Sequence, residues 1–149
     1  MRYKKAILNV DGCAQPNPGP AGAGAIMRDG EDEVIFTISK PLGERTSNQA
    51  EYGALILGLE RVISDYDVDT LIVRSDSELL VKQITGTYRV KNLGLAALKD
   101  QVDTLVGQLG DFRIEHIRRE ENVEADRLSD EAVRGKRAGS DMQGRLNCS

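Results

Sequence analysis

The 149-residue chain contains no tryptophan, a single histidine and only two cysteines, and aromatic residues make up 4% of it. The two cysteines, Cys13 and Cys148, supply neither a disulfide framework nor the four ligands of a structural zinc site. No uninterrupted apolar stretch approaches the roughly 20 residues that cross a membrane, and the segment after Met1 shows no signal-peptide pattern. We therefore expect a cytoplasmic protein that is not associated with a membrane.

The composition is that of an ordinary globular protein, with 40% apolar and 30% charged residues. The length fits one domain, which we expect to comprise residues 1–135, with residues 136–149 as a polar C-terminal tail. The net charge of -4 argues mildly against a polyanionic partner, because nucleic-acid-binding proteins usually carry a basic surface. Three basic groups interrupt the acidic background: Arg89 with Lys91, Arg118 with Arg119, and Arg134 with Lys136 and Arg137. Such groups most often form a solvated surface, so charge alone does not decide the partner.

The hydrophobic patterns predict five strands and four helices in the order β-β-β-α-β-α-α-β-α. The expected strands are 5–11, 24–28, 34–39, 71–75 and 112–117, and the expected helices are 46–65, 77–84, 95–109 and 122–134. Residues 12–22 are expected to form a loop, because proline supplies no amide donor to a sheet, and residues 41–45 a second loop. Long connections that carry helices imply parallel pairing of the later strands. We therefore predict an α/β fold with a mixed five-stranded sheet and helices on both faces.

Four acids stand where an acid is an awkward structural choice. Asp11 and Asp76 follow apolar runs that are typical of buried strands. Glu51 continues the core-facing stripe of a helix, although alone it would be read as a solvated first-turn acid, and Asp126 lies in the first turns of the last helix. If the fold brings them together, the carboxylates repel one another unless they are protonated or bind a cation. Oxygen ligands alone favour Mg²⁺ or Mn²⁺, so the sequence predicts a metal-dependent enzyme.

The segment from Asp11 to Pro20 is the most specific stretch of the chain. It is not a glycine-rich phosphate-binding loop, because no Gly-Lys-Ser/Thr follows it. Instead, Asp11-Gly12 followed by Asn17-Pro18-Gly19-Pro20 resembles type 1 ribonuclease H, the family that cuts RNA in RNA/DNA hybrids. Three further motifs carry the resemblance: Thr46-Ser47-Asn48-Gln49-Ala50-Glu51, Ser75-Asp76-Ser77, and Asn122-Val123-Glu124-Ala125-Asp126. Each motif is weak alone, but the four occur in the right order on the right elements, and the resemblance covers residues 5–132.

The resemblance implies a ribonuclease H-like fold and a set of catalytic acids that are also the metal ligands: Asp11, Glu51, Asp76 and Asp126. In such enzymes two Mg²⁺ ions, roughly 3.5–4 Å apart, bind the scissile phosphate, and Mn²⁺ is expected to substitute for Mg²⁺. Asp11 would be the ligand that both ions share. The resemblance also implies endonucleolytic hydrolysis of the RNA strand that leaves 5′-phosphate and 3′-hydroxyl ends.

The resemblance further assigns contacts with the hybrid. Backbone amides near Gly12 and the side chains of Asn17 and Asn48 correspond to contacts that distinguish ribose from deoxyribose through the 2′-hydroxyl. Thr46 and Asn92 correspond to a pocket for a phosphate of the DNA strand. From the residues alone, Asn17 is also an ordinary Asn-Pro turn residue and Asn48 a possible helix cap. We expect the RNA/DNA hybrid as partner, no obligate protein partner and a monomer.

Two features depart from many relatives. Those relatives carry a histidine in a flexible loop ahead of the last acid, whereas the only histidine here, His116, lies inside an expected strand and is interpreted as structural. Residues 85–98 contain only Arg89 and Lys91 as cations and no tryptophan. The basic, aromatic handle of some relatives is therefore expected to be absent, and the affinity for hybrid to be low.

Two other functions compete with this prediction. One is another nuclease of the same fold, such as a resolvase or a 3′ exonuclease, against which Asn17 and Asn48 argue. The other is a non-catalytic hybrid-binding module, which has no need of all four acids. We therefore predict a Mg²⁺-dependent endoribonuclease specific for RNA/DNA hybrids.

Overall fold

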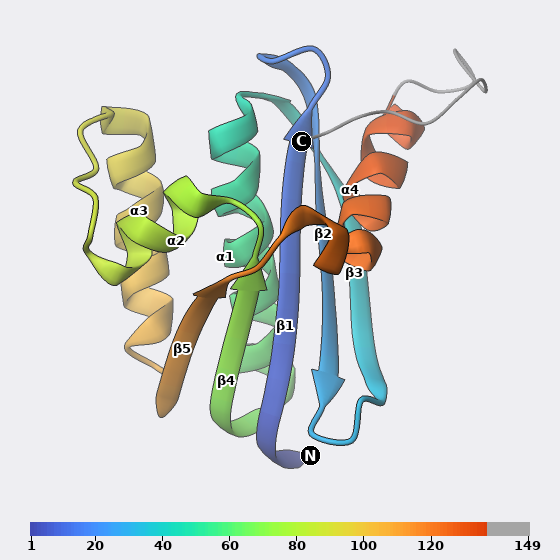
Figure 1. The fold of residues 1–149 in the computed structure, drawn as a ribbon, viewed down its shortest axis with the longest axis vertical. Coiled ribbons are helices and arrows are strands. Elements are labelled where there is room, and N and C mark those ends of the chain that lie inside the picture. Colours follow the sequence, from blue (N-terminus) through green and yellow to red (C-terminus); the bar gives the residue numbers. More distant parts are fainter. Residues whose placement is uncertain (137–149) are drawn as a thin grey trace.

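The computed structural model describes residues 1–136. Five strands form one sheet: β1 (Arg2–Ala14), β2 (Gly19–Asp29), β3 (Val34–Arg45), β4 (Asp67–Ser75) and β5 (Asp111–His116). Their order is β3-β2-β1-β4-β5, with β1 in the middle (Figure 1). The β1–β2 and β2–β3 pairs are antiparallel, whereas β4 pairs in parallel with both β1 and β5. The prediction of a mixed five-stranded sheet is confirmed.

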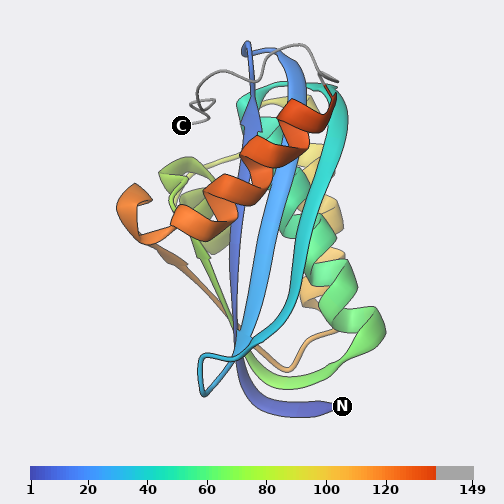
Figure 2. The same cartoon turned by 90° about the vertical axis from the view of Figure 1, so that its right-hand side faces the viewer.

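Helices cover both faces of this sheet, also as predicted. They are α1 (Ser47–Asp65), α2 (Glu78–Thr85), α3 (Leu93–Val106) and α4 (Val123–Lys136), the last preceded by the short 3-10 helix η1 (Arg119–Glu121). Figure 2 shows α4 on one face of the sheet and α1 on the other. The main core lies on the α1 side, where Leu8 and Val10 of β1 pack with Leu55 and Leu59 of α1. Because side chains alternate along a strand, Asp11 points to the α4 side.

The predicted loop at residues 12–22 is wrong at both ends. β1 continues to Ala14 and β2 begins at Gly19, so that only residues 15–18 connect them. Ala14 pairs with Ala21, and the amide of Gln15 donates to the carbonyl of Pro20 at 3.0 Å. Pro20 joins the sheet because this pairing uses its carbonyl oxygen and does not need the amide that proline lacks.

The predicted loop at residues 41–45 is also part of a strand. β3 runs to Arg45, with a register shift where Pro41 faces Gly22 and Gly43 faces Ala21. β3 lies at the edge of the sheet and has a neighbouring strand on one side only. The missing amide of Pro41 therefore deprives no strand on the other side of a hydrogen bond. The antiparallel half of the sheet is therefore longer than the sequence predicted.

The helix boundaries follow the predictions within a few residues, and side-chain caps mark the starts of three helices. Thr46 caps α1: its side chain accepts from the amide of Gln49 at 3.1 Å, and the side chain of Gln49 accepts from the amide of Thr46 at 2.9 Å. Ser77 caps α2. Asn92 caps α3, which therefore begins at residue 93 rather than at the predicted residue 95.

Glycines let helices on both faces approach the sheet closely. A Cβ at Gly12 would lie 2.2 Å from the backbone carbonyl of Ala50 in α1. On the other face, a Cβ at Gly24 would lie 2.3 Å from the carbonyl oxygen of Ala125 in α4. Contacts this short would force the helices away from the sheet. The glycines therefore set how closely α1 and α4 pack on the sheet, and with it the positions of the functional residues that these helices carry.

The predicted domain boundary falls near the end of α4, which extends to Lys136. The remainder of the predicted tail, with Arg137 and Cys148, lies outside the described residues. Among residues 1–136, no helix is both long enough and apolar enough to cross a membrane.

Candidate metal centre and substrate surface

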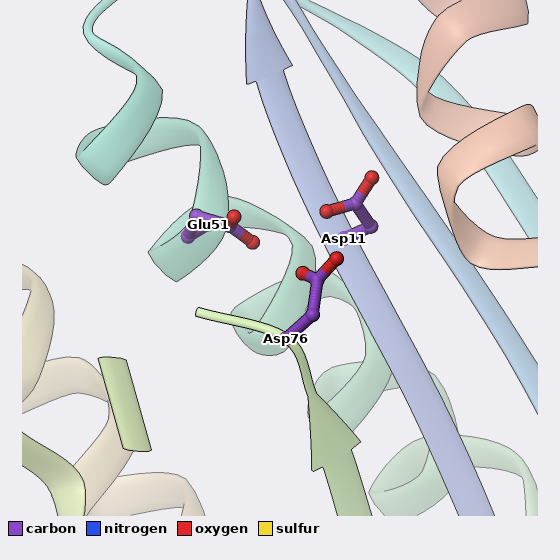
Figure 3. Close-up of side chains that lie close together, drawn as sticks. All are labelled: Asp11, Glu51 and Asp76. Atoms are coloured by element: carbon purple, nitrogen blue, oxygen red, sulfur yellow. The ribbon is translucent and has the colours of Figure 1, made fainter. Parts of the chain in front are cut away.

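Three of the four predicted acids meet at one edge of the sheet. β1 and β4 run in parallel as far as the pair Val10–Ser75, and Asp11 and Asp76 each follow that pair. Glu51 reaches the same place from the first turns of α1. The ligand atoms of these three acids lie within 4.8 Å of one another, and Figure 3 shows their carboxylates grouped together. The sequence alone did not show whether the four acids come together. In the structure, Asp11, Glu51 and Asp76 do.

The backbone of β1 holds Glu51 in place. Its Oε1 accepts a hydrogen bond from the amide of Gly12 at 3.0 Å. The missing side chain of Gly12 is also what lets α1 come this close to β1. We predicted that amides near Gly12 contact the substrate. In this structure the Gly12 amide orients an acid, and its contact with a substrate stays a prediction.

Burial and mutual repulsion oppose the ionisation of the triad. Asp11 is fully buried, and burial, followed by repulsion from Glu51 and two further acids, raises its pKa from 3.8 to about 10. Burial first, and then the charge of Asp76, raises the pKa of Glu51 well above its usual value. Burial, and then the charge of Asp126, raises the pKa of Asp76. Such a cluster either retains protons or binds a cation.

The donor set suits a hard divalent cation. Within residues 1–136, Oδ1 of Asp11 is buried with no hydrogen-bond partner, whereas Oδ2 accepts from the Ser129 hydroxyl at 3.0 Å. Leaving a buried acceptor without a partner costs on the order of 1–3 kcal/mol, which a bound cation would offset. The three acids offer only carboxylate oxygens, which favours Mg²⁺ or Mn²⁺ over softer metals. The cluster is therefore consistent with a divalent-metal site.

Asp126, the fourth predicted acid, is not part of the group within 4.8 Å. It lies in the first turn of α4, where its amide donates to the carbonyl of Asn122 at 3.1 Å. Its charge is nevertheless near enough to raise the pKa values of Asp11, Glu51 and Asp76. The structure thus places Asp126 beside the triad, and its role as a metal ligand stays a prediction.

Asn48, one of the predicted ribose contacts, lies in the first turn of α1. Asn17, the other, lies in the β1–β2 connection beside the start of this helix. Oδ1 of Asn17 accepts from the amide of Ser47 at 2.9 Å and so joins the β1–β2 connection to the helix. Asn48 is exposed in the first turn and does not cap the helix, because Thr46 does. The alternative interpretation of Asn48 as a helix cap is therefore wrong. Asn48 lies three residues before Glu51 and hence on the same side of α1.

Thr46 and Asn92, the predicted phosphate contacts, cap α1 and α3. Oδ1 of Asn92 accepts from the amide of Leu95 at 3.0 Å. A Cβ at Gly94 would lie 3.2 Å from Oδ1 of Asn92 and 3.5 Å from Nε2 of Gln49, so the two capping regions adjoin. Adjacent helix N-termini present amide donors to an anion. The arrangement suits a phosphate, and the contact itself stays a prediction.

Two buried polar residues contribute more than the sequence indicated. Asn122, given by the sequence only as the first residue of a motif, donates from Nδ2 to the carbonyl of Val10 at 2.9 Å and accepts from the side chain of Asn9 at 2.9 Å. It thereby ties the start of α4 to β1. Ser129, which the sequence analysis missed, donates to an acid of the triad. The only available signal was its position three residues after Asp126, on the same side of the helix.

His116 lies in a strand, as predicted. It is the last residue of β5, is exposed and pairs with Ser75 of β4. The α2–α3 connection spans residues 86–92, and within the described chain no further helix lies between these two helices. The chain therefore has neither a histidine-bearing loop before α4 nor a helical insertion after α2.

The sheet order and the acid triad together define a ribonuclease H-like protein of the α/β class. Residues 9–132 match the family model described as reverse transcriptase-like. Ribonuclease HI of Halobacterium salinarum is 35% identical over 123 residues, which make up 83% of this chain. The chain spans 61% of the length of that curated relative.

Two solved structures that align with most of this chain support the same assignment. The crystal structure of RNase H1 from Halobacterium salinarum has a TM-score of 0.85 at 32% identity, covering 88% of this chain and 98% of that one. LC11-RNase H1, crystallised in complex with an RNA/DNA hybrid, has a TM-score of 0.84 at 35% identity, covering 89% of this chain and 99% of that one. The chain belongs to the type 1 ribonuclease H family. It is thus a ribonuclease H homologue, as the four motifs predicted.

Proposed function

We propose that this protein is an endonuclease that hydrolyses the RNA strand of RNA/DNA hybrids with the help of divalent cations. The observation that carries the proposal is the buried Asp11 carboxylate, which is grouped with Glu51 and Asp76 and has one oxygen to which no described residue donates a hydrogen bond. A catalytic site explains why a protein keeps three mutually repelling acids together. The similarity to LC11-RNase H1, which was crystallised with an RNA/DNA hybrid, supports this choice of substrate.

Asp11, Glu51, Asp76 and Asp126 would hold two Mg²⁺ ions, with Asp11 as the shared ligand. When bound, such ions lower the pKa of water and stabilise the negative charge that develops at the scissile phosphate. The chain itself supplies a fixed frame. The Gly12 amide holds Glu51, and the Asn122 side chain ties α4 to β1. Groups fixed in advance need no reorganisation during the reaction, and hydrolysis at this site would leave 5′-phosphate and 3′-hydroxyl ends.

Asn17 and Asn48 would read the ribose of the RNA strand. Only the 2′-hydroxyl distinguishes RNA from DNA locally, and an amide side chain can both donate to it and accept from it. Asn48 is exposed on the side of α1 that carries Glu51, so it can contact a strand that lies over the acids. Thr46 and Asn92 would bind a phosphate of the DNA strand where the two helix N-termini adjoin.

A cleavage assay with three substrates of one sequence tests this function. The purified protein is incubated with Mg²⁺ and a 5′-labelled RNA/DNA hybrid, duplex DNA or single-stranded RNA. We expect cleavage of the RNA strand in the hybrid alone, at internal positions, and none when a chelator removes the metal. Equal cleavage of duplex DNA would instead indicate a nuclease with another specificity. Binding of the hybrid without cleavage would indicate a non-catalytic module.

Asn48→Ala tests the ribose contact within the same assay. Loss of a polar partner should slow hybrid cleavage by raising its activation free energy by roughly 1–3 kcal/mol. It should also weaken the preference for RNA. Asn48 is exposed and makes no cap, so the fold should be unaffected. An unchanged rate and preference would remove Asn48 from the substrate surface.

A further inference from the structure

The side chain of Ser129 connects the acid triad to α4. It is fully buried, and its Oγ lies 3.0 Å from Oδ2 of Asp11 and 2.9 Å from the carbonyl oxygen of Asp126. Ser129 belongs to none of the four motifs, and the proposed function gives it no role. Its position between two of the predicted acids therefore needs its own explanation.

The hydroxyl of Ser129 has one proton and two acceptors within reach. A serine inside a helix commonly donates to a carbonyl one turn earlier, which here is the carbonyl of Asp126. An ionised carboxylate is the stronger acceptor, because hydrogen bonds to charged groups are shorter and stronger than those between neutral groups. When Asp11 is ionised, as a metal ligand must be, the hydroxyl therefore donates to Asp11.

This hydrogen bond treats the two oxygens of Asp11 differently. Oδ2 accepts from Ser129, whereas Oδ1 is buried and has no hydrogen-bond partner in the described part of the chain. A carboxylate held at one oxygen no longer turns freely, so the direction of its second oxygen is fixed as well. The ligand atoms that Asp11, Glu51 and Asp76 offer lie within 4.8 Å of one another. Anchoring one oxygen thus leaves the other available for a cation.

The packing of α4 on β2 brings Ser129 within reach of β1. A Cβ at Gly24 would lie 2.5 Å from the Ser129 amide nitrogen, and a Cβ at Gly22 would lie 2.6 Å from the Ser129 carbonyl oxygen. Ser129 therefore lies directly over two residues of β2 that have no side chain. Only this close approach allows a side chain as short as serine to reach Asp11 on the neighbouring strand.

We propose that Ser129 is a positioning residue of the metal centre, whose hydroxyl orients Asp11 so that one carboxylate oxygen is presented to a divalent cation. The effect that we expect from removing this hydroxyl on hybrid cleavage rests on the proposed function. The effect that we expect on metal binding does not.

Calorimetric titration of the hybrid-free protein with Mn²⁺ tests the metal-binding part directly. Residues that orient metal ligands typically contribute roughly 10-fold or more to metal affinity, so Ser129→Ala should bind Mn²⁺ roughly 10-fold more weakly than the unaltered protein. In hybrid cleavage, Ser129→Ala should need correspondingly more Mg²⁺ for half-maximal rate. The rate should recover at high Mg²⁺, and the KM for hybrid should stay the same.

Ser39→Ala is the matched control. The hydroxyl of Ser39 in β3 donates to the carbonyl of Leu128 at 2.7 Å, so it also ties α4 to the sheet through a serine, but it is hydrogen-bonded to no acid among residues 1–136. Ser39→Ala should therefore keep the Mn²⁺ affinity and the Mg²⁺ requirement of the unaltered protein. An equal loss of affinity in both variants would mean that Ser129 merely fastens α4, and it would overturn the proposal.

Unchanged Mn²⁺ affinity in folded Ser129→Ala would overturn the proposal as well. If Ser129→Ala does not fold, Ser129→Cys replaces it, because a thiol has a similar size and is a weaker donor. Its affinity should fall in the same direction, and an unaltered affinity would again contradict the proposal. If the unaltered protein binds Mn²⁺ but cleaves no hybrid, the proposed function fails, while the comparison of metal affinities still decides the role of Ser129.

Discussion

Replacing Asp76 with asparagine removes one charge of the acid triad with little change of shape. Asp76→Asn should abolish hybrid cleavage in Mg²⁺, because asparagine keeps the size of the side chain but loses the charge that holds a metal. Without metal, the variant should unfold at an equal or higher temperature, since one of the mutually repelling carboxylates is gone. Cleavage assays and metal-free thermal unfolding measure the two effects. Near-normal turnover by folded Asp76→Asn would contradict the proposed site.

His116 should be dispensable for catalysis. It lies exposed at the end of β5 and outside the acid triad, so His116→Ala should change the rate per folded molecule only a few-fold. That is less than the roughly 10²-fold loss typical of removing a general acid or base. The rate should also rise with pH without the inflection that a catalytic histidine would add. Kinetics at saturating Mg²⁺ and hybrid would reveal a larger loss, which would place His116 in the active site.

At the scale of residues, the sequence predicted those site residues that follow a strand or belong to a motif. Asp11 and Asp76 were recognisable because each follows an apolar run, where an acid has no structural purpose. Ser129 was not recognisable, because a serine inside a helix has many ordinary explanations. Its role depends on the distance between α4 and β1, which only the assembled fold determines.

Gly24→Ala tests how the sheet positions α4. The added Cβ would lie 2.3 Å from the carbonyl oxygen of Ala125 and 2.5 Å from the amide nitrogen of Ser129, and neither backbone atom can move alone. Forced overpacking of this kind typically costs about 1–3 kcal/mol of unfolding free energy. Cleavage should fall as well, because α4 then carries Ser129 and Asp126 away from Asp11. Chemical denaturation and hybrid cleavage measure the two losses.

Gly135→Ala provides the control within the same helix. A Cβ at Gly135 meets no atom of the described residues within 4 Å, and alanine is the better helix former by about 1 kcal/mol. This variant should keep its activity and be as stable as the unaltered protein or more stable. Comparable destabilisation by both substitutions would show that α4 tolerates no change at all, and the argument from close approach would fail.

At the scale of elements, helix starts were predicted to within about two residues and strand ends poorly. Thr46, Ser77 and Asn92 mark helix starts by local hydrogen bonds, which depend on nearby sequence only. The extensions of β1, β2 and β3 depend on partners far away in the sequence. Proline was taken as a strand breaker, but Pro20 contributes a carbonyl and Pro41 lies in an edge strand. The error came from judging the residue without its pairing.

The metal-free protein should lose stability as the pH rises. The folded-state pKa of Asp11 is raised from 3.8 to about 10, so between these values the folded chain keeps a proton that the unfolded chain has released. The unfolding free energy therefore falls with increasing pH across this range, and this contribution is fully present only below the unfolded-state pKa. Thermal unfolding in the presence of a chelator would measure the fall. It should be smaller in Asp11→Asn.

Mg²⁺ should counteract this loss, and more strongly at high pH. A cation binds the ionised acids, so its affinity grows as protons become scarce, and the stabilisation follows the ratio of its concentration to its Kd. The rise in unfolding temperature on adding saturating Mg²⁺ should be larger at about pH 8 than at about pH 5.5. An equal rise at both pH values would mean that the ion does not compete with protons at these acids.

At the scale of the whole molecule, the order of elements was enough to predict the layers. Helices between later strands require parallel pairing, and β4 indeed pairs in parallel with β1 and β5. The parallel pairing of β1 with β4 brings the ends of these two strands to one edge, where Asp11 and Asp76 meet. The sequence could not show that Asp126 lies beside the triad rather than within 4.8 Å of it, because that separation depends on how α4 crosses the sheet.

The position of α4 has a consequence for local motion. This helix covers the side of the sheet to which Asp11 points, and it carries Asp126, whose charge adds to the repulsion there. Partial detachment of α4 would let water reach Asp11 and move Asp126 away, so it relieves the repulsion without unfolding the α1 side of the core. We therefore expect the metal-free protein to open more readily at α4 than at α1. Its amide hydrogens should exchange faster than those of α1, and a bound cation should slow them.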